Sequence, residues 1–214
     1  MKPAAGHRRL VAATRATGSV VASGLLRLEV TGRHLVPTTG PVLLAGNHSG
    51  LLDGPLVYLL SPRPVAMLAK SELFVGRWPP VLDALGLVPV HRGTPDRTAL
   101  QRGLAHLQDG GALCVFPEGT RGSGDLAQIA DGLAYFALRS GAAVVPVAVT
   151  GTAQAWPKGA LLPRLRAPVH VAFGAPVALT VEGDPRARRT LSTAAEQLRL
   201  ALLDHLQAST GAFT

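Results

Sequence analysis

The sequence lacks a long uninterrupted apolar stretch. No run approaches the roughly 18 apolar residues typical of a membrane-spanning helix, because a charge, a Pro or a Gly breaks each one earlier. Near the N-terminus Lys2 precedes an apolar segment that Arg15 interrupts early, and this argues against a secretory signal. The sequence therefore predicts neither a spanning helix nor a leader.

Cysteine and metal-binding patterns are also scarce. The single Cys114 excludes an internal disulfide and lies in an apolar run at 112–116, so we interpret it as a core residue rather than a nucleophile. His48, His91 and His106 are widely spaced and have no H-x3-H or C-x2-C companion. We therefore expect no metal site and no cofactor.

Aromatic residues make up 4% of the chain, and no basic segment is interleaved with them. This composition argues against a nucleic-acid partner, whose bases would need stacking platforms. The net charge is nevertheless +8, which favours an anionic partner. A membrane surface or a phosphorylated substrate fits this charge better than nucleic acid does.

The chain of 214 residues is 47% hydrophobic, which suits one domain with a sizeable core. Segments typical of strands alternate with segments typical of helices, so the prediction is an α/β fold: a single layered sheet, mostly parallel or mixed, flanked by helices. Pro146 suggests that the run 142–149 is an edge strand or ends near the proline. The predicted strands are 28–32, 41–46, 65–69, 87–90, 112–116, 142–149 and 169–173.

Helices are predicted between these strands and at both ends. We expect the segment 1–27 to form a partly amphipathic helix that packs on the domain, although it could lie on a bilayer. Residues 28–214 form the main domain. Thr94, Pro95 and Asp96 look like a helix start. The remaining predicted helices are 54–60, a piece from 71 to 86 interrupted at Pro79 and Pro80, one ending before 110, 131–140 and 184–207.

The most informative segment is Asn47–Asp53, which follows the buried strand at 41–46. Polar residues at the carboxyl end of such a strand are where open α/β sheets place their sites. If His48 lies on the turn and Asp53 on the first helical turn, the carboxylate can hold one ring nitrogen and fix the tautomer. The pair would act as a general base, but the simpler alternative is that both residues only cap the turn and the helix.

Two further polar turns follow strands. In the stretch 116–121, Pro117 and Gly119 shape a tight turn, and Arg121 offers a planar fork suited to phosphate. Glu118 could bind substrate hydroxyls or simply pair with Arg121. Arg92, after the strand at 87–90, is a second candidate for anion binding. Pro146 is expected to shape backbone only.

Taken in order, these turns resemble the glycerolipid acyltransferases, specifically the 1-acylglycerol-3-phosphate acyltransferase type. The NH-x4-D signature is met by Asn47, His48 and Asp53, and FPEGTR is reproduced at 116–121. A Gly–apolar–Arg segment at 86–92 and a Val-Pro stretch at 144–149 match two weaker signatures. Two departures are that Gly50 stands where members commonly have Ser, and that 128–132 lacks their Lys.

The resemblance implies transfer of a fatty acyl group from coenzyme A or acyl carrier protein to a lysolipid hydroxyl, with 1-acyl-sn-glycerol-3-phosphate as acceptor. His48 would be the base and Asp53 its orienting group, and amides near the turns could stabilise the oxyanion. Asn47, Pro117 and Pro146 would be supporting residues. The residues implied in substrate binding are Arg92, Glu118, Gly119, Thr120 and Arg121.

The resemblance also implies a place for the protein, in the cytoplasm and peripheral on the inner face of the cell membrane, where the basic residues meet anionic lipid. Two other functions stay open at this point. One is a lipid-binding protein without catalysis on the same fold. The other is a thioester hydrolase that uses the same base on water.

Overall fold

A computed structural model of the protein describes residues 5–91, 96–119 and 122–211. Its centre is a seven-stranded sheet in the order β1-β7-β6-β2-β5-β3-β4. All neighbouring strands pair in parallel except β6 and β7, which are antiparallel. The strands are β1 Arg27–Thr31, β2 Val42–Gly46, β3 Ala66–Lys70, β4 Leu87–Val90, β5 Ala112–Val115, β6 Ala143–Thr150 and β7 Pro168–Phe173.

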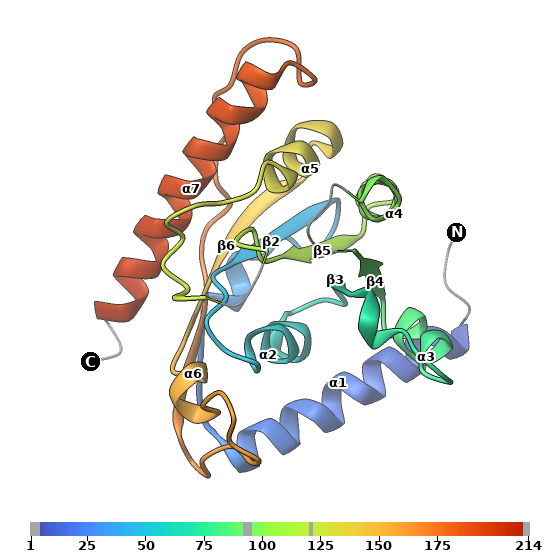
Figure 1. Ribbon diagram of the computed structural model, residues 1–214, viewed down its shortest axis with the longest axis vertical. Coiled ribbons are helices and arrows are strands. Elements are labelled where there is room, and N and C mark those ends of the chain that lie inside the picture. The colour runs from blue at the N-terminus through green and yellow to red at the C-terminus, as the bar shows by residue number, and fades with distance from the viewer. Residues whose placement is uncertain (1–4, 92–95, 120–121, 212–214) are drawn as a thin grey trace.

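The helices cover both faces of this sheet, so the α/β prediction is confirmed (Figure 1). Helices α1 and α2 share one apolar cluster with the sheet, and α4, α5 and α7 share a second cluster on the opposite face. The central strands β2 and β5 are buried along their whole length, as sheets covered on both faces require. The α-helices are α1 Ala5–Leu25, α2 Asp53–Leu60, α3 Pro79–Ala84, α4 Arg97–Gln108, α5 Gly132–Ser140, α6 Thr152–Ala155 and α7 Arg188–Gly211.

Helix α1 packs on α2 through a half-buried basic side chain. The guanidinium of Arg15 donates hydrogen bonds to the backbone carbonyls of Tyr58 and Ser61 at the end of α2. Gly18 lies against Leu59, where an added Cβ would come within 2.5 Å of a leucine methyl. Within the described ranges, no helix is both long enough and apolar enough to cross a bilayer.

The position of Pro146 differs from the prediction, because β6 is a central strand and continues past the proline. The Pro146 carbonyl accepts from Gly174 N at 2.8 Å, so the proline's N and C=O face the β7 side of the strand. On that side the β6–β7 ladder begins only at Val147. The missing N–H therefore removes no hydrogen bond of the β2–β6 ladder, and the strand tolerates the proline.

Three helix boundaries also differ from the prediction. Pro79 and Pro80 begin α3 rather than interrupt a longer helix, since proline suits the first helical turn; residues 71–73 form only a short 3-10 turn. Asp96 is the N-cap of α4 and accepts from Ala99 N, and Thr94 and Pro95 lie outside the described residues. The C-terminal helix is displaced from 184–207 to 188–211.

The packing of α4 on α5 gives a test of this core. Gly103 of α4 faces the buried Phe136, and an added Cβ would lie 2.9 Å from two atoms of that ring. Overpacking of this kind costs about 1–3 kcal/mol, while the helix propensity of Ala returns up to about 1 kcal/mol. We expect Gly103→Ala to lower the free energy of unfolding, measured in urea, by about 1–2 kcal/mol.

Gly24→Ala in α1 is the matched control, because no atom lies within 4 Å of its added Cβ. Its free energy of unfolding should stay level or rise by a few tenths of a kcal/mol. Equal stability of the two variants would contradict the tight α4–α5 contact.

Candidate active site

The polar turns predicted from the sequence meet at one edge of the sheet. Strands β2, β5 and β6 run parallel, so the turns that follow them emerge side by side. The turn after β2 carries His48, the turn after β5 carries Glu118, and Gly151 and Thr152 follow β6. We call this the site edge.

His48 and Asp53 are in direct contact, which is the first of the two alternatives that their spacing left open. The imidazole Nδ1 lies 2.9 Å from Asp53 Oδ2. Because a carboxylate can only accept, Nδ1 carries the shared proton and Nε2 is left as the basic nitrogen. The ring also stacks on Phe116, with centroids 4.4 Å apart and planes inclined by 24°. The imidazole is thus held at both its edge and its face.

The carboxylate of Asp53 is fully buried and has three further donors. Oδ2 accepts from the backbone N–H groups of Ser49 at 2.8 Å and of Gly50 at 2.7 Å. Oδ1 accepts from the hydroxyl of Thr152, which is also fully buried. A Cβ on Gly50 would lie 2.4 Å from that hydroxyl oxygen, so glycine here makes room for Thr152.

Thr152 is the residue that sequence reasoning missed. It lies 99 positions from Asp53, and nothing in the NH-x4-D signature points to it. A signal does exist, because Thr152 is a polar residue directly after a buried strand that runs parallel to β2. The same signal identified His48.

Glu118 joins the two main turns through a contact that the sequence did not predict. Its Oε1 accepts from the backbone N–H of His48 at 2.9 Å, and the His48 carbonyl accepts from Gly122 N at 3.1 Å. The pKa of Glu118 is raised, chiefly because partial burial removes water from the carboxylate, and Asp125 adds to the shift. The expected Glu118–Arg121 pair lies outside the described residues.

The predicted supporting residues hold backbone in place. The Asn47 side chain donates to Val149 O at 2.9 Å and accepts from Val149 N at 2.8 Å, which ties the ends of β2 and β6 together. The carbonyl of the buried Pro117 accepts from Ala130 N at 2.8 Å. Gly119, which was predicted to bind substrate, has a φ of 71° and closes the turn by donating its N–H to Phe116 O at 3.0 Å. Pro146 lies in mid-strand, away from these turns.

Three predicted substrate-binding residues lie outside the part of the chain that the structure describes. Arg92, Thr120 and Arg121 fall in 92–95 and 120–121, outside the described ranges. Among the described residues, no group of three or more His, Cys, Asp or Glu could hold a metal ion. Cys114 is buried in β5, and burial raises the pKa of its thiol, which keeps it protonated and unreactive.

A large apolar cavity of about 800 Å³ opens beside His48. Strand β3 pairs with β5 only through Ala66 and Met67, although β3 continues to Lys70. The cavity lies where the two strands separate, because its walls come from the later parts of both and from helices on both faces of the sheet. Residues that line it include His48, Tyr58, Leu59, Ala69, Val115, Phe116 and Leu133.

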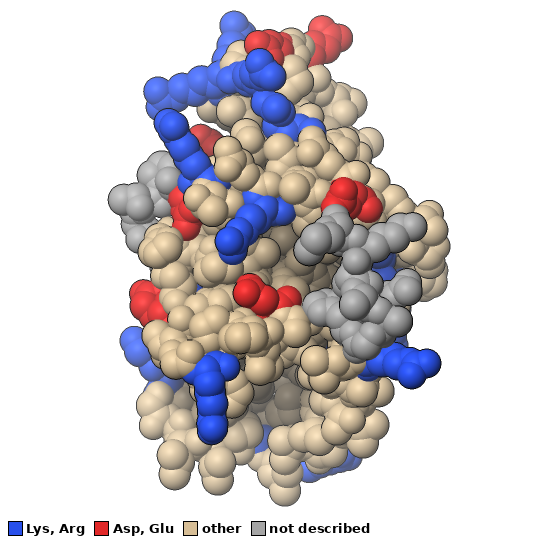
Figure 2. Space-filling model, turned by 90° about the vertical axis from the view of Figure 1, so that its right-hand side faces the viewer, with Lys and Arg blue, Asp and Glu red and all other residues tan. Residues whose placement is uncertain are grey.

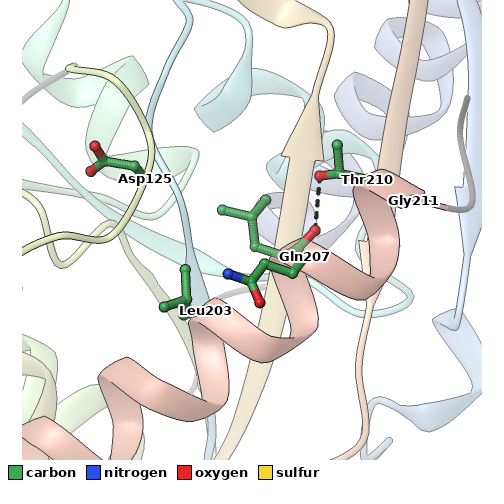
Figure 3. Close-up of a pocket in the computed structure, with 6 residues that line it drawn as sticks. Asp125, Leu203, Gln207, Thr210 and Gly211 are labelled. Atoms are coloured by element: carbon green, nitrogen blue, oxygen red, sulfur yellow. Dashed lines mark hydrogen bonds between the residues drawn. The ribbon is translucent and has the colours of Figure 1, made fainter.

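A second hollow, of about 480 Å³, lies elsewhere, between the C-terminal half of α7 and Asp125 (Figure 3). Leu203, Gln207 and Thr210 of α7 border it, and the Thr210 hydroxyl donates to the Leu206 carbonyl at 2.8 Å. None of the predicted site residues lines it. The chemistry therefore belongs with the larger cavity.

Basic side chains do not gather into one stripe on the face drawn in Figure 2. Lys and Arg are spread from the top to the bottom of that face, and acidic side chains lie among them. The basic side chains visible on this face are therefore dispersed rather than concentrated.

Comparison with known proteins identifies the family. The sequence model of the acyltransferase family matches residues 27–150, a range that contains His48, Asp53 and Glu118. The chain therefore belongs to the acyltransferase family. In fold it is similar to the crystal structure of the 1-acyl-sn-glycerophosphate acyltransferase PlsC from Thermotoga maritima, with a TM-score of 0.69 and 24% identity over 94% of this chain and 81% of that one.

Several curated proteins are similar in sequence. A 1-acyl-sn-glycerol-3-phosphate acyltransferase from Cocos nucifera is 28% identical over 88% of this chain, and one from Borreliella burgdorferi is 30% identical over 59%. A lyso-ornithine lipid O-acyltransferase from Pseudomonas aeruginosa is 35% identical over 51%. The chain spans 66%, 52% and 43% of the lengths of these three relatives, respectively.

The role of Thr152 can be tested by stability. Thr152→Val keeps the shape but leaves Asp53 Oδ1 without its donor, and a buried polar atom left unsatisfied costs about 1–3 kcal/mol. We expect that loss in the free energy of unfolding, measured in urea. Thr152→Ser should recover most of it.

Thr150→Val is the matched control, two positions earlier. Among the described residues the buried hydroxyl of Thr150 has no hydrogen-bond partner, so its removal should leave stability unchanged or raise it. If both Val variants behaved alike, the hydroxyl of Thr152 would have no special part in holding Asp53.

Proposed function

We propose that this chain transfers a fatty acyl group from an acyl thioester to the hydroxyl of a lysolipid. The donor would be carried on coenzyme A or acyl carrier protein, and the favoured acceptor is 1-acyl-sn-glycerol-3-phosphate. The observation that carries the proposal is the position of the His48 side chain. Its Nδ1 lies 2.9 Å from Asp53 Oδ2, and its ring lines an apolar cavity of about 800 Å³.

The proposed chemistry needs no nucleophile from the protein. His48 Nε2 removes the acceptor's hydroxyl proton while the oxygen attacks the thioester carbon. The tetrahedral intermediate collapses, the C–S bond breaks, and the thiolate takes the proton back from His48. Holding both substrates together makes direct attack efficient, and Asp53 stabilises the transient imidazolium.

The cavity supplies the place for the acyl chain. Its volume falls within the roughly 300–1,000 Å³ of small-molecule sites, and its lining is largely apolar, so an alkyl chain is a better occupant than a polar group. His48 lies in the wall of this cavity. An acyl chain inserted there would leave its thioester near the imidazole.

Recognition of the acceptor is proposed from the motifs. Arg121 and Arg92 would bind its phosphate, and Glu118, Gly119 and Thr120 would shape that pocket. The absence of a Lys in 128–132 removes one positive charge expected for a phosphate acceptor. Because one relative is named a lyso-ornithine lipid acyltransferase, lyso-ornithine lipid is the second acceptor to test.

The substrates also suggest where the protein works. A lysolipid acceptor lies in a membrane and an acyl thioester is made in the cytoplasm, so we propose a cytoplasmic protein bound to the inner face of the cell membrane. No resident cofactor enters the proposed reaction. The alternatives are a lipid-binding protein without catalysis, or a hydrolase that gives the acyl group to water.

The first experiment incubates the protein with radiolabelled acyl-CoA and a panel of lysolipids, with mass analysis of the products. We expect diacyl lipid and free coenzyme A in equal amounts. His48→Ala should lower kcat at least about 100-fold, since general-base catalysis contributes roughly 10²–10⁴ in rate. The melting temperature of this variant and its affinity for acyl-CoA should equal those of wild type.

His34→Ala is the matched control. His34 is exposed and follows β1. Because β1 runs opposite to β6, its carboxyl end lies away from the site edge, so transfer should continue at the normal rate. Free fatty acid in place of diacyl lipid would favour the hydrolase, and no release of thiol from any donor would favour the non-catalytic protein.

Acyl-chain length tests the cavity. Ala69 is 8% exposed and lines the cavity without belonging to either apolar cluster. We expect Ala69→Phe to shift the preferred donor to a shorter chain, measured as kcat/KM over a series of acyl-CoA esters. The melting temperature should change little, because the cavity has room for the ring. An unchanged length profile would place the acyl chain elsewhere.

A further inference from the structure

The loop between α6 and β7, residues 156–167, exposes three leucines to solvent. Leu161 is 89% exposed, Leu162 73% and Leu165 71%. Leu161 is the most exposed large apolar side chain in the described part of the chain. Adjacent leucines displayed in this way leave apolar surface in water, which is unfavourable unless something covers it.

The backbone of this loop is held by hydrogen bonds, so the exposure of the leucines does not result from an unconstrained loop. Arg164 N donates to Ala155 O at 2.7 Å, Ala160 N donates to Pro157 O at 3.0 Å, and the Trp156 indole N–H donates to Ala160 O at 2.9 Å. Arg166 N donates to Leu25 O at 2.6 Å, which fastens the loop to the end of α1. The fold therefore holds the three leucines outward.

The charges around the leucines indicate what covers them. Lys158, Arg164 and Arg166 are exposed, and the stretch 156–167 contains no acidic residue. Among the described residues none of the three forms a salt bridge. The Arg166 guanidinium donates to the Ser23 carbonyl, at 3.4 Å. Leucines between cations that have no acidic partner suit an anionic bilayer, where apolar groups enter and cations meet headgroups. A second copy would bring like charges together.

The loop also lies at the site edge. Strand β6 ends at Thr150 there, and β7 starts back from Pro168 in the antiparallel direction, so the whole connection stays at that edge. The C-terminal end of α1 reaches the same corner (Figure 1) and exposes Val21 and Leu25 by 53% and 43%. A membrane covering the loop would therefore face the edge that bears His48.

We propose that loop 156–167 docks the protein on an anionic bilayer by inserting Leu161, Leu162 and Leu165 while its cations contact the headgroups. The proposed function supplies the reason for docking, since a lysolipid lies in the membrane. The docking itself stands on the exposure, rigidity and charge of the loop and is measured without turnover.

The test is flotation of the full chain with vesicles of phosphatidylcholine containing 30% phosphatidylglycerol, and with phosphatidylcholine alone. The triple variant Leu161→Ser/Leu162→Ser/Leu165→Ser should lose at least about tenfold in partition coefficient, because each fully buried leucine contributes about tenfold or more. Lys158→Gln/Arg164→Gln should abolish the preference for the anionic vesicles, and added salt should weaken wild-type binding.

Leu200→Ser is the matched control. Leu200 is 46% exposed on α7, on the face of the sheet opposite α1, and its variant should bind like wild type. In a Trp78→Phe background Trp156 is the only Trp of the chain, so brominated lipid should quench its fluorescence on anionic vesicles.

Four results would overturn the docking proposal. They are no vesicle binding by wild type, binding of the triple variant within twofold of wild type, no quenching of Trp156, or a triple variant that changes its oligomeric state but not its vesicle binding.

Acyl transfer to a short-chain acceptor below its micelle concentration separates the docking proposal from the proposed function. Transfer with intact vesicle binding in the triple variant refutes the docking surface alone. Loss of vesicle binding in the triple variant, with no transfer by wild type, refutes the function alone.

Discussion

The site depends on a carboxylate that has no exposed surface. Burying an ionised group costs several kcal/mol unless hydrogen bonds replace the lost water. Asp53 recovers four of them, from the His48 ring, the N–H groups of Ser49 and Gly50, and the Thr152 hydroxyl. These donors come from the β2 turn and from the segment after β6. The charge can be buried only when both strands are in register.

The same bonding restricts the chemistry. The backbone N–H groups of residues 48, 49 and 50 all donate to carboxylates, the first to Glu118 and the other two to Asp53. These three amides therefore already have acceptors, and the expectation that amides near the turns stabilise an oxyanion stays a prediction for the other amides. The three are occupied in fixing the base. In the proposed reaction, charge that develops on the thioester oxygen would have to be stabilised by other groups of the site edge.

The sequence predicted what is determined locally. Buried strands such as 41–46 read as apolar runs, and His48 and Asp53 are close enough in the chain for their contact to follow from the turn. Thr152 and the Glu118–His48 bond could not be derived that way, because strand order brings them together. The prediction of an edge strand or a strand end at Pro146 was wrong for the same reason. Whether the missing N–H removes a ladder hydrogen bond depends on which neighbouring strand that position faces.

The chain contains an internal comparison that shows how little spacing alone means. His91 and Asp96 are also five apart, and His91 Nδ1 lies 3.0 Å from Asp96 Oδ2, much as in the first pair. There, however, the imidazole side chain is 74% exposed, and Asp96 mainly caps α4 through Ala99 N. The His48 side chain is 12% exposed, with a ring stacked on Phe116 and a carboxylate cut off from water. A base is useful only where its proton transfer is shielded and its substrate is held. The gap between β3 and β5 opens an apolar cavity that both imidazoles border, but only the His48 ring is also shielded from solvent.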